Sequence, residues 1–127
     1  MADQAYVVEY YYKTKWGCAE EWLALFRKNH VPYLKALQKQ GRIVDLKMEK
    51  PQYHMTEEAR WDYRVTITWK NMAASAESRG GDALRKKLFP DQETFKREEQ
   101  RRFEILLAHW DLPVVPVSAK GENGAEA

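Results

Sequence analysis

Residues 61–70 alternate strictly between apolar and polar side chains. The odd positions from 61 to 69 hold Trp, Tyr, Val, Ile and Trp, and the even positions from 62 to 70 hold Asp, Arg, Thr, Thr and Lys. Because successive side chains of a β-strand point to opposite faces of its sheet, this pattern predicts a strand with one buried and one polar face. Its β-branched and aromatic residues favour the same structure. We expect this strand near the centre of a sheet, with Trp61 and Trp69 buried beneath helices.

Composition and charge exclude several classes of protein. The 127 residues suit a single domain, and 44% of them are hydrophobic, which is enough for a core. The net charge of +2 is small, whereas a nucleic-acid binder usually has a strong basic excess. No apolar run approaches the roughly 18 residues that suggest a membrane span. The single cysteine, Cys18, excludes an internal disulfide. We therefore expect no nucleic-acid partner and no membrane segment.

Neither end of the chain is expected to belong to the folded domain. Residues 1–4 are Met-Ala-Asp-Gln, which is no secretory signal peptide. We therefore expect a cytoplasmic protein, while a periplasmic or secreted one would require a leader removed before residue 1. Residues 118–127 are small and polar, so we expect disordered segments at 1–4 and 118–127 around one folded domain, 5–117.

Two further segments before the opening strand have clear periodicity. Residues 5–13 alternate as a strand. Residues 18–40 predict a helix, with a kink or restart at Pro32, which lacks the N–H of a helical hydrogen bond. One helical face carries residues spaced by three or four, namely Trp22, Phe26, His30, Tyr33 and Leu37. Gly41 suits the end of this helix.

The other elements follow from shorter patterns. Residues 42–50 predict a strand with two distinct faces, Val44, Leu46 and Met48 on one and Ile43, Asp45, Lys47 and Glu49 on the other. Asn71 is a suitable cap for a short helix at 72–77. Further helices are expected at 82–89 and, after Pro90, at 91–110. The two prolines within 112–117 predict an irregular edge strand.

This order of elements defines a fold class. The sequence predicts an α+β protein with a ferredoxin-like β-α-β-β-α-β order and an extra helix in the second crossover. In that fold the first two strands are not neighbours, and another strand of the sheet fills the position between them. Helices cover one face of such a sheet, and the other face stays open.

One motif resembles a known superfamily. The pattern Trp22-x-x-x-Phe26, followed by Asn29-His30-x-Pro32-x-Leu34, Gly41 and a strand, resembles the first-helix signature of the dimeric α/β-barrel proteins. The resemblance spans about residues 5–117 and is nearest to EthD-like, NIPSNAP-like and antibiotic-biosynthesis-monooxygenase-like proteins, in a bacterial branch. It implies a ferredoxin-like subunit whose sheet packs against a second copy, and His30 matches the histidine of that helix. Members include cofactor-independent oxygenases, haem-degrading enzymes and isomerases, and we expect no cofactor here.

The three histidines lie in different sequence contexts, which suggest different roles. His30 lies on the apolar helical stripe, where a neutral imidazole can act as a base or bind a ligand. The alternative for His30 is a packed side chain bonded to backbone. His54 lies in a loop, where function is concentrated but exposed histidines are common. His109 falls in the last turn of the expected helix, where a cation suits the helix dipole. Their spacing matches no metal motif, so we expect no metal site.

The polar face of the sheet is the second candidate surface. Glu9, Tyr11, Asp62 and Arg64 are expected to share it, with Asp62 beside Arg64. In a lone domain these groups would meet water, whereas in a dimeric barrel they would line an interior and require partners. The sequence leaves both arrangements open.

These observations support a small-molecule protein more than the alternatives. We expect a pocket for a small apolar or aromatic molecule between the first helix and the sheet, within a homodimer. The alternative is a non-catalytic interaction module, and the residues leave open whether the protein is an enzyme. An RNA-binding domain would need glycine in its third strand, and residues 60–71 have none. The candidate residues are, for catalysis, His30, Asp62 and Arg64, and, for ligand binding, Phe26, Tyr11, Glu9 and His54.

Overall fold

The structure is a computed structural model that describes residues 4–77 and 80–121. The expected disordered ends fall largely outside it, since residues 1–3 and 122–127 are not among those described. The described helices include none that is long and apolar enough to cross a lipid bilayer.

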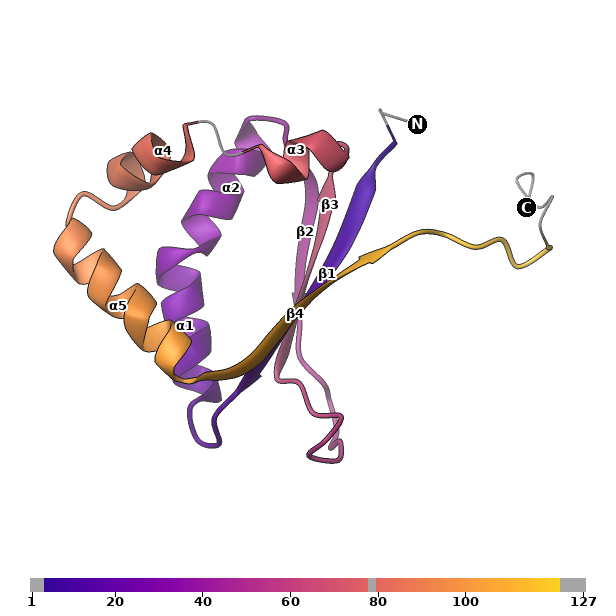
Figure 1. Cartoon of the computed structure of the whole chain (residues 1–127), viewed down its shortest axis with the longest axis horizontal. Helices are drawn as coiled ribbons and strands as arrows, with labels where there is room; N and C mark the ends of the chain where they lie inside the picture. The colour runs from indigo at the N-terminus through magenta and orange to yellow at the C-terminus, as the bar shows by residue number, and fades with distance from the viewer. Residues whose placement is uncertain (1–3, 78–79, 122–127) are drawn as a thin grey trace.

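A four-stranded antiparallel sheet forms the centre of the fold (Figure 1). Its strands are β1 (Tyr6–Thr14), β2 (Ile43–Glu49), β3 (Tyr63–Trp69) and β4 (Leu106–Val114). They lie in the order β2-β3-β1-β4, so β1 and β3 occupy the centre and β2 and β4 the edges. This is the ferredoxin-like arrangement that the order of elements predicts.

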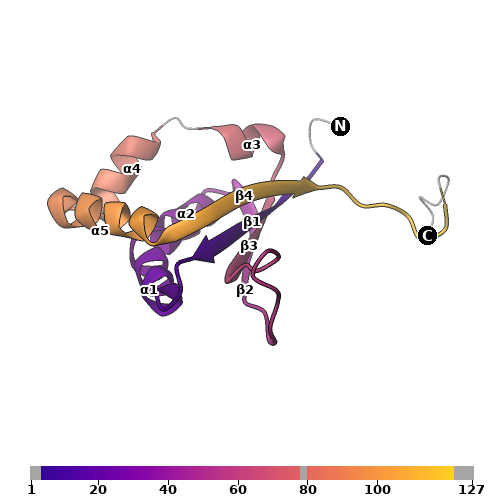
Figure 2. The same cartoon turned by 60° about the horizontal axis from the view of Figure 1, so that its bottom comes forward.

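In the described part of the chain, five helices accompany the sheet. They are α1 (Ala19–Asn29), α2 (Val31–Lys39), α3 (Met72–Ala76), α4 (Gly81–Leu88) and α5 (Gln92–Glu104). Figures 1 and 2 show them on one side of the sheet, with α4 and α5 beyond α1 and α2. The side chains of Asn71 and Asp91 accept hydrogen bonds from backbone N–H groups in the first turns of α3 and α5. The additional helix α4 and its neighbour α5 both belong to the second crossover.

The predicted interruption of the first helix is present. Helix α1 ends at Asn29, His30 adopts φ −124° and ψ −39°, and α2 starts with Pro32 in its first turn. Proline is tolerated there because the first-turn N–H groups of a helix have no intrahelical partner. His30 therefore sits at a break between two helices instead of within one.

The predicted faces of β3 and β1 are confirmed over most of their length. Tyr63, Val65, Ile67 and Trp69 all point into the core under the helices. Val8 and Tyr12 of β1 are buried on the same face. The alternation read from the sequence therefore orients the central pair of strands correctly.

The prediction for Trp61 is wrong. Strand β3 starts at Tyr63, and Trp61 is only half-buried, with its ring 5.2 Å from that of Tyr11 on the open face. The alternation stops at Asp62 because its Oδ2 accepts hydrogen bonds from the Thr14 N–H at 2.8 Å and from Arg60 at 2.7 Å. These bonds turn the chain before the strand begins.

The faces predicted for β2 are also wrong at its first residues. A register irregularity lies between Ile43 and Asp45, so Ile43 is 2% exposed in the core and Val44 is 60% exposed. A bulge inserts one residue and moves the preceding side chain to the opposite face. Leu46 and Met48 keep the predicted direction and pack against the core.

The C-terminal helix is shorter than predicted. It ends at Glu104 instead of 110, and the last strand runs over Leu106–Val114 instead of 112–117. His109 is therefore a strand residue, with its ring stacked 4.4 Å from that of Tyr12, and the proposed helix-dipole role does not apply. Pro113 is accommodated because β4 is an edge strand.

Candidate functional site

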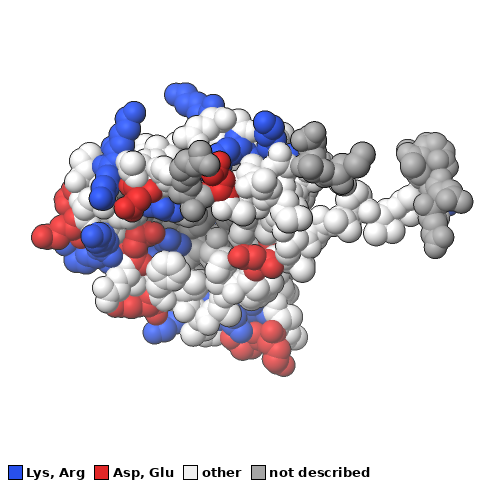
Figure 3. Space-filling model, turned by 45° about the horizontal axis from the view of Figure 1, so that its top comes forward, with Lys and Arg blue, Asp and Glu red and all other residues white. Residues whose placement is uncertain are grey.

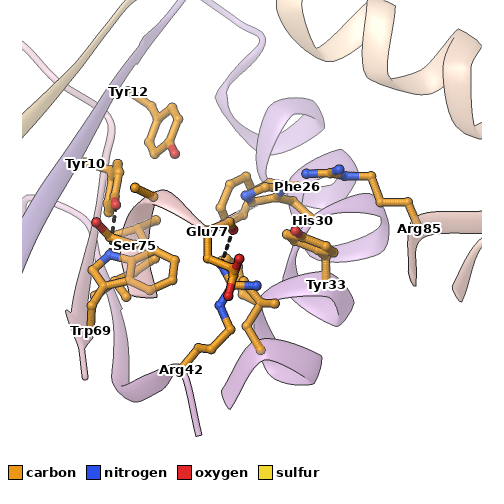
Figure 4. Close-up of a pocket in the computed structure, with 15 residues that line it drawn as sticks. Tyr10, Tyr12, Phe26, His30, Tyr33, Arg42, Trp69, Ser75, Glu77 and Arg85 are labelled. Atoms are coloured by element: carbon orange, nitrogen blue, oxygen red, sulfur yellow. Dashed lines mark hydrogen bonds between the residues drawn. The ribbon is translucent and has the colours of Figure 1, made fainter. Parts of the chain in front are cut away.

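A cavity of about 270 Å³ lies between the helical layer and the sheet (Figure 4). Helices α1 and α2 form one wall, β1 and β3 form the other, and α3 and α4 contribute to its rim. This volume lies just below the roughly 300–1,000 Å³ that is typical of ligand pockets, which favours a small ligand. The lining consists of Tyr10, Tyr12, Phe26, His30, Tyr33, Leu34, Leu37, Arg42, Val65, Ile67, Trp69, Ser75, Ala76, Glu77 and Arg85.

Most of the residues that line the cavity are aromatic or aliphatic. Phe26, Val65 and Ile67 come from the faces of α1 and β3 whose periodicity predicts burial. On the sheet side, Trp69 Nε1 donates a hydrogen bond of 3.1 Å to the hydroxyl of Tyr10. An apolar interior with few, fixed polar groups is the usual composition of a small-molecule site.

Two tyrosine hydroxyls provide polar groups on the sheet side. Figure 4 shows Tyr10 and Tyr12 side by side on β1. Burial raises the pKa of both hydroxyls, so both are neutral near physiological pH. A neutral phenol can donate one hydrogen bond and accept others, and these groups can orient a ligand.

His30 provides a neutral imidazole on the helical side. Its ring lies 5.0 Å from that of Phe26, at the break between α1 and α2. Burial, followed by the charges of Arg102 and Arg85, lowers the pKa of His30 to about 4. Within residues 4–77 and 80–121 the ring makes no hydrogen bond. The alternative of a packed histidine bonded to backbone therefore finds no support.

Two arginines bring positive charge to the cavity rim. Arg42 extends from the start of β2 and donates to the carbonyl oxygen of Ala74 at 2.9 Å and to that of Glu77. Arg85 reaches from α4 over the ring of Tyr33, with its Cζ 4.2 Å from the ring centroid. The cavity thus combines apolar walls, neutral polar groups, two arginines and the acidic residue Glu77.

The other candidates from the sequence lie elsewhere. Glu9, Tyr11 and Arg64 are on the open face of the sheet, as predicted. The Tyr11 hydroxyl donates to Glu9 Oε1 at 2.6 Å, and Arg64 pairs with Glu49 Oε1 at 2.7 Å. Since the sheet separates this surface from the cavity, these residues form no common site with His30.

Asp62 and His54 lie in a third place. Asp62 does not sit beside Arg64, because its carboxylate bonds to Thr14 and to the nearly buried Arg60. Asp62 and His54 both line a surface hollow of about 300 Å³ near the loop between β2 and β3. Of the seven candidates, only His30 and Phe26 meet in the cavity.

Sequence reasoning missed several cavity residues. The strand alternation places Tyr10, Tyr12 and Trp69 on the core-facing side of the sheet. Their hydroxyl and indole N–H groups could have marked them as polar groups of a cavity there. Arg85 carried no such signal, because its contact with Tyr33 joins α4 to α2 across a long stretch of chain. No group of three His, Cys, Asp or Glu within the described ranges is arranged to hold a metal ion.

Comparisons with known proteins identify the fold. No protein-family model and no curated protein matches the chain. Among solved structures, a NIPSNAP family protein from Agrobacterium tumefaciens matches with TM-score 0.54 and 13% identity over 91% of this chain and 96% of that one. A dimeric ferredoxin-like protein from an uncultured marine organism matches with TM-score 0.56 and 10% identity over 93% of both chains.

A third structure is a variant of SnoaB, a cofactor-independent oxygenase from Streptomyces nogalater. It matches with TM-score 0.50 and 12% identity over 95% of this chain and 100% of that one. At such identities the likeness concerns the fold. The chain therefore has a ferredoxin-like fold, as the order of its elements predicts.

The low pKa of His30 predicts a specific dependence of stability on pH. Between pH 6.5, its ordinary pKa, and about 4, the unfolded chain binds a proton at this residue and the folded chain does not. The free energy of unfolding should therefore decrease as the pH is lowered through this window. His30 alone should contribute a decrease on the order of 3 kcal/mol. His30→Gln has no such group, so its curve should be flatter.

Urea unfolding of both proteins at pH values across this window measures the effect. The unfolding free energy of wild type minus that of the variant should decrease steadily as the pH is lowered from 6.5 to about 4. Parallel curves would show that His30 titrates normally in the folded state and is not held neutral by burial.

Proposed function

We propose that this protein binds a small apolar or aromatic organic molecule in the cavity between α1, α2 and the sheet. The observation that supports this proposal most is that aromatic walls meet the Tyr12 hydroxyl and a neutral His30, whose ring makes no hydrogen bond to the described residues. Burying the apolar surface of a ligand supplies about 25 cal/mol per Å². The polar groups then fix the orientation of the ligand within the cavity.

His30 acts in this proposal as a hydrogen-bonding group more than as a strong base. A general base works best when its pKa lies near the working pH, and that of His30 is about 4. A neutral imidazole still has one donor and one acceptor nitrogen. It can therefore hold a hydroxyl or carbonyl group of the ligand without taking up a proton.

The fold is compatible with small-molecule chemistry in the same region. One structure with this fold is a cofactor-independent oxygenase. Such a precedent supports a small-molecule protein over a purely structural module, because the cavity has the walls and polar groups that such a role requires. Binding is the step that the cavity itself supports, and any transformation would use His30 and the tyrosine hydroxyls.

The first test is calorimetric titration with cinnamyl alcohol, a neutral aromatic probe with one hydroxyl group. We expect wild-type protein to bind it and His30→Gln to bind it roughly 2–10-fold more weakly, because the Gln amide does not place its donor and acceptor where the ring nitrogens lie. His54→Gln is the matched control, because His54 lies in the hollow near the β2–β3 loop. This control should bind the probe as wild type does.

Two results would contradict the proposal. One is the absence of any binding by correctly folded wild-type protein. The other is an equal loss of affinity in His54→Gln and His30→Gln, which would place the probe outside the cavity.

We also propose that the open face of the sheet forms a homodimer interface. Tyr11 stacks on Trp110 with ring centroids 5.3 Å apart, and Trp61 packs edge-on against Tyr11. Trp110 is 39% and Leu112 47% exposed although both are large and apolar. Exposed apolar groups gathered on one sheet face favour association with another molecule.

The segment after β4 adds to this apolar surface. It extends away from the body of the molecule and carries no charged side chain between Leu112 and Ala119 (Figure 3). Val115 and Val117 are 78% and 89% exposed. A second copy related by a two-fold axis would cover both the strand and the segment.

Light scattering after size exclusion tests this interface. Wild type should have about 30 kDa, twice the chain mass of 15.0 kDa, and Trp110→Glu should shift the protein toward monomer because a charge would be buried in the interface. Tyr53→Glu places the same charge on an exposed loop aromatic and should remain dimeric. A monomeric wild-type protein at micromolar concentration would contradict the proposed dimer.

A further inference from the structure

The guanidinium group of Arg85 is the feature of the cavity that the binding of a neutral ligand leaves unexplained. It lines the cavity and stacks on Tyr33, yet among the described residues it makes no ion pair and no hydrogen bond. Cation–π stacking at a partly exposed site contributes only about 0.5–1 kcal/mol. Figure 4 shows the side chain running from α4 toward Tyr33 and His30.

The other two arginines near the cavity, Arg102 and Arg42, donate hydrogen bonds to other groups of the protein. Arg102 is nearly buried and forms two bonds of 2.9 Å with the carboxylate of Glu99. Arg42 donates to two backbone carbonyl groups at the end of α3. Arg85 therefore differs from both, because its hydrogen-bond donors remain available to a molecule in the cavity.

The close approach of α4 to α2 holds Arg85 in this position. Gly81 opens α4 and is buried, and a Cβ at this residue would lie 3.0 Å from the Tyr33 hydroxyl and 3.3 Å from Arg85 Nη1. Any larger residue would push these two groups away. The absence of a side chain at Gly81 thus lets the first turn of α4 bring Arg85 over the ring of Tyr33.

We propose that the cavity selects aromatic molecules that carry a carboxylate, with Arg85 binding the anionic group and the apolar walls binding the ring. This inference rests on the proposed function and adds a substrate class to it. A guanidinium group presents paired N–H donors that match a carboxylate. Arg85 also lowers the pKa of His30, and a bound carboxylate would offset that positive charge.

The test compares three probes of the same shape at pH 7, where the acid is ionised: cinnamate, cinnamamide and cinnamyl alcohol. Wild type should bind cinnamate about tenfold or more tightly than cinnamamide. Arg85→Gln should remove this preference by weakening cinnamate binding alone, and Arg85→Lys should retain part of it. Lys87→Gln, which removes an exposed charge from the same helix, should behave as wild type.

The outcomes separate the two proposals. Equal affinity of wild type for all three probes overturns the inference and leaves the cavity as a site for neutral aromatics. Retention of the preference in folded Arg85→Gln also overturns it. Failure of wild type to bind any of the three overturns the proposed function together with the inference.

Discussion

The contact of α1 with the sheet through Trp22 and Phe26 is the interaction on which the rest of the molecule depends. Both side chains are completely buried, and the Trp22 ring stacks on Tyr63 at 5.4 Å and packs against Tyr12 at 4.5 Å. The indole N–H of Trp22 has no hydrogen-bond partner among the described residues, which costs about 1–3 kcal/mol. Burying an aromatic side chain of roughly 150–250 Å² gains about 4–6 kcal/mol, so burial outweighs this cost.

The end of α1 determines where the cavity forms. Phe26 belongs both to the packed core and to the cavity wall, and His30 follows it one turn later at the helix break. The missing N–H of Pro32 favours this break, because a continuous helix would leave the Lys28 carbonyl without its usual partner. The same local chemistry that interrupts the helix thus places an imidazole, free of hydrogen bonds to the described chain, beside an apolar space.

Periodicity in the sequence identifies the parts of the fold that follow one rule over several residues. It orients β3 and β1, finds the helix break, and places Phe26 and His30 on the helical face toward the sheet. A period of two cannot reveal the bulge that buries Ile43. It also cannot reveal that the Asp62 side chain bonds to Thr14 and Arg60 instead of continuing the alternation, since both partners lie outside β3.

The last strand and the cavity rim required information from distant segments. Residues 106–114 contain enough leucine to continue a helix. They form a strand because they pair with β1. Arg85 lies in a run of basic residues that is typical of a solvated helix, and its place at the cavity depends on how α4 meets Tyr33. The sequence could therefore predict the helical and sheet walls, whereas the charged rim depends on tertiary contacts.

We propose above all that the ligand site lies on the helical side of the sheet and not on its open face. The indole N–H signals in an NMR spectrum test this directly, because Trp69 lines the cavity whereas Trp61 and Trp110 pack around Tyr11 on the open face. On titration with cinnamyl alcohol, the Trp69 signal should shift while the signals of the other two stay in place. Shifts of Trp61 and Trp110 with an unchanged Trp69 signal would contradict the account.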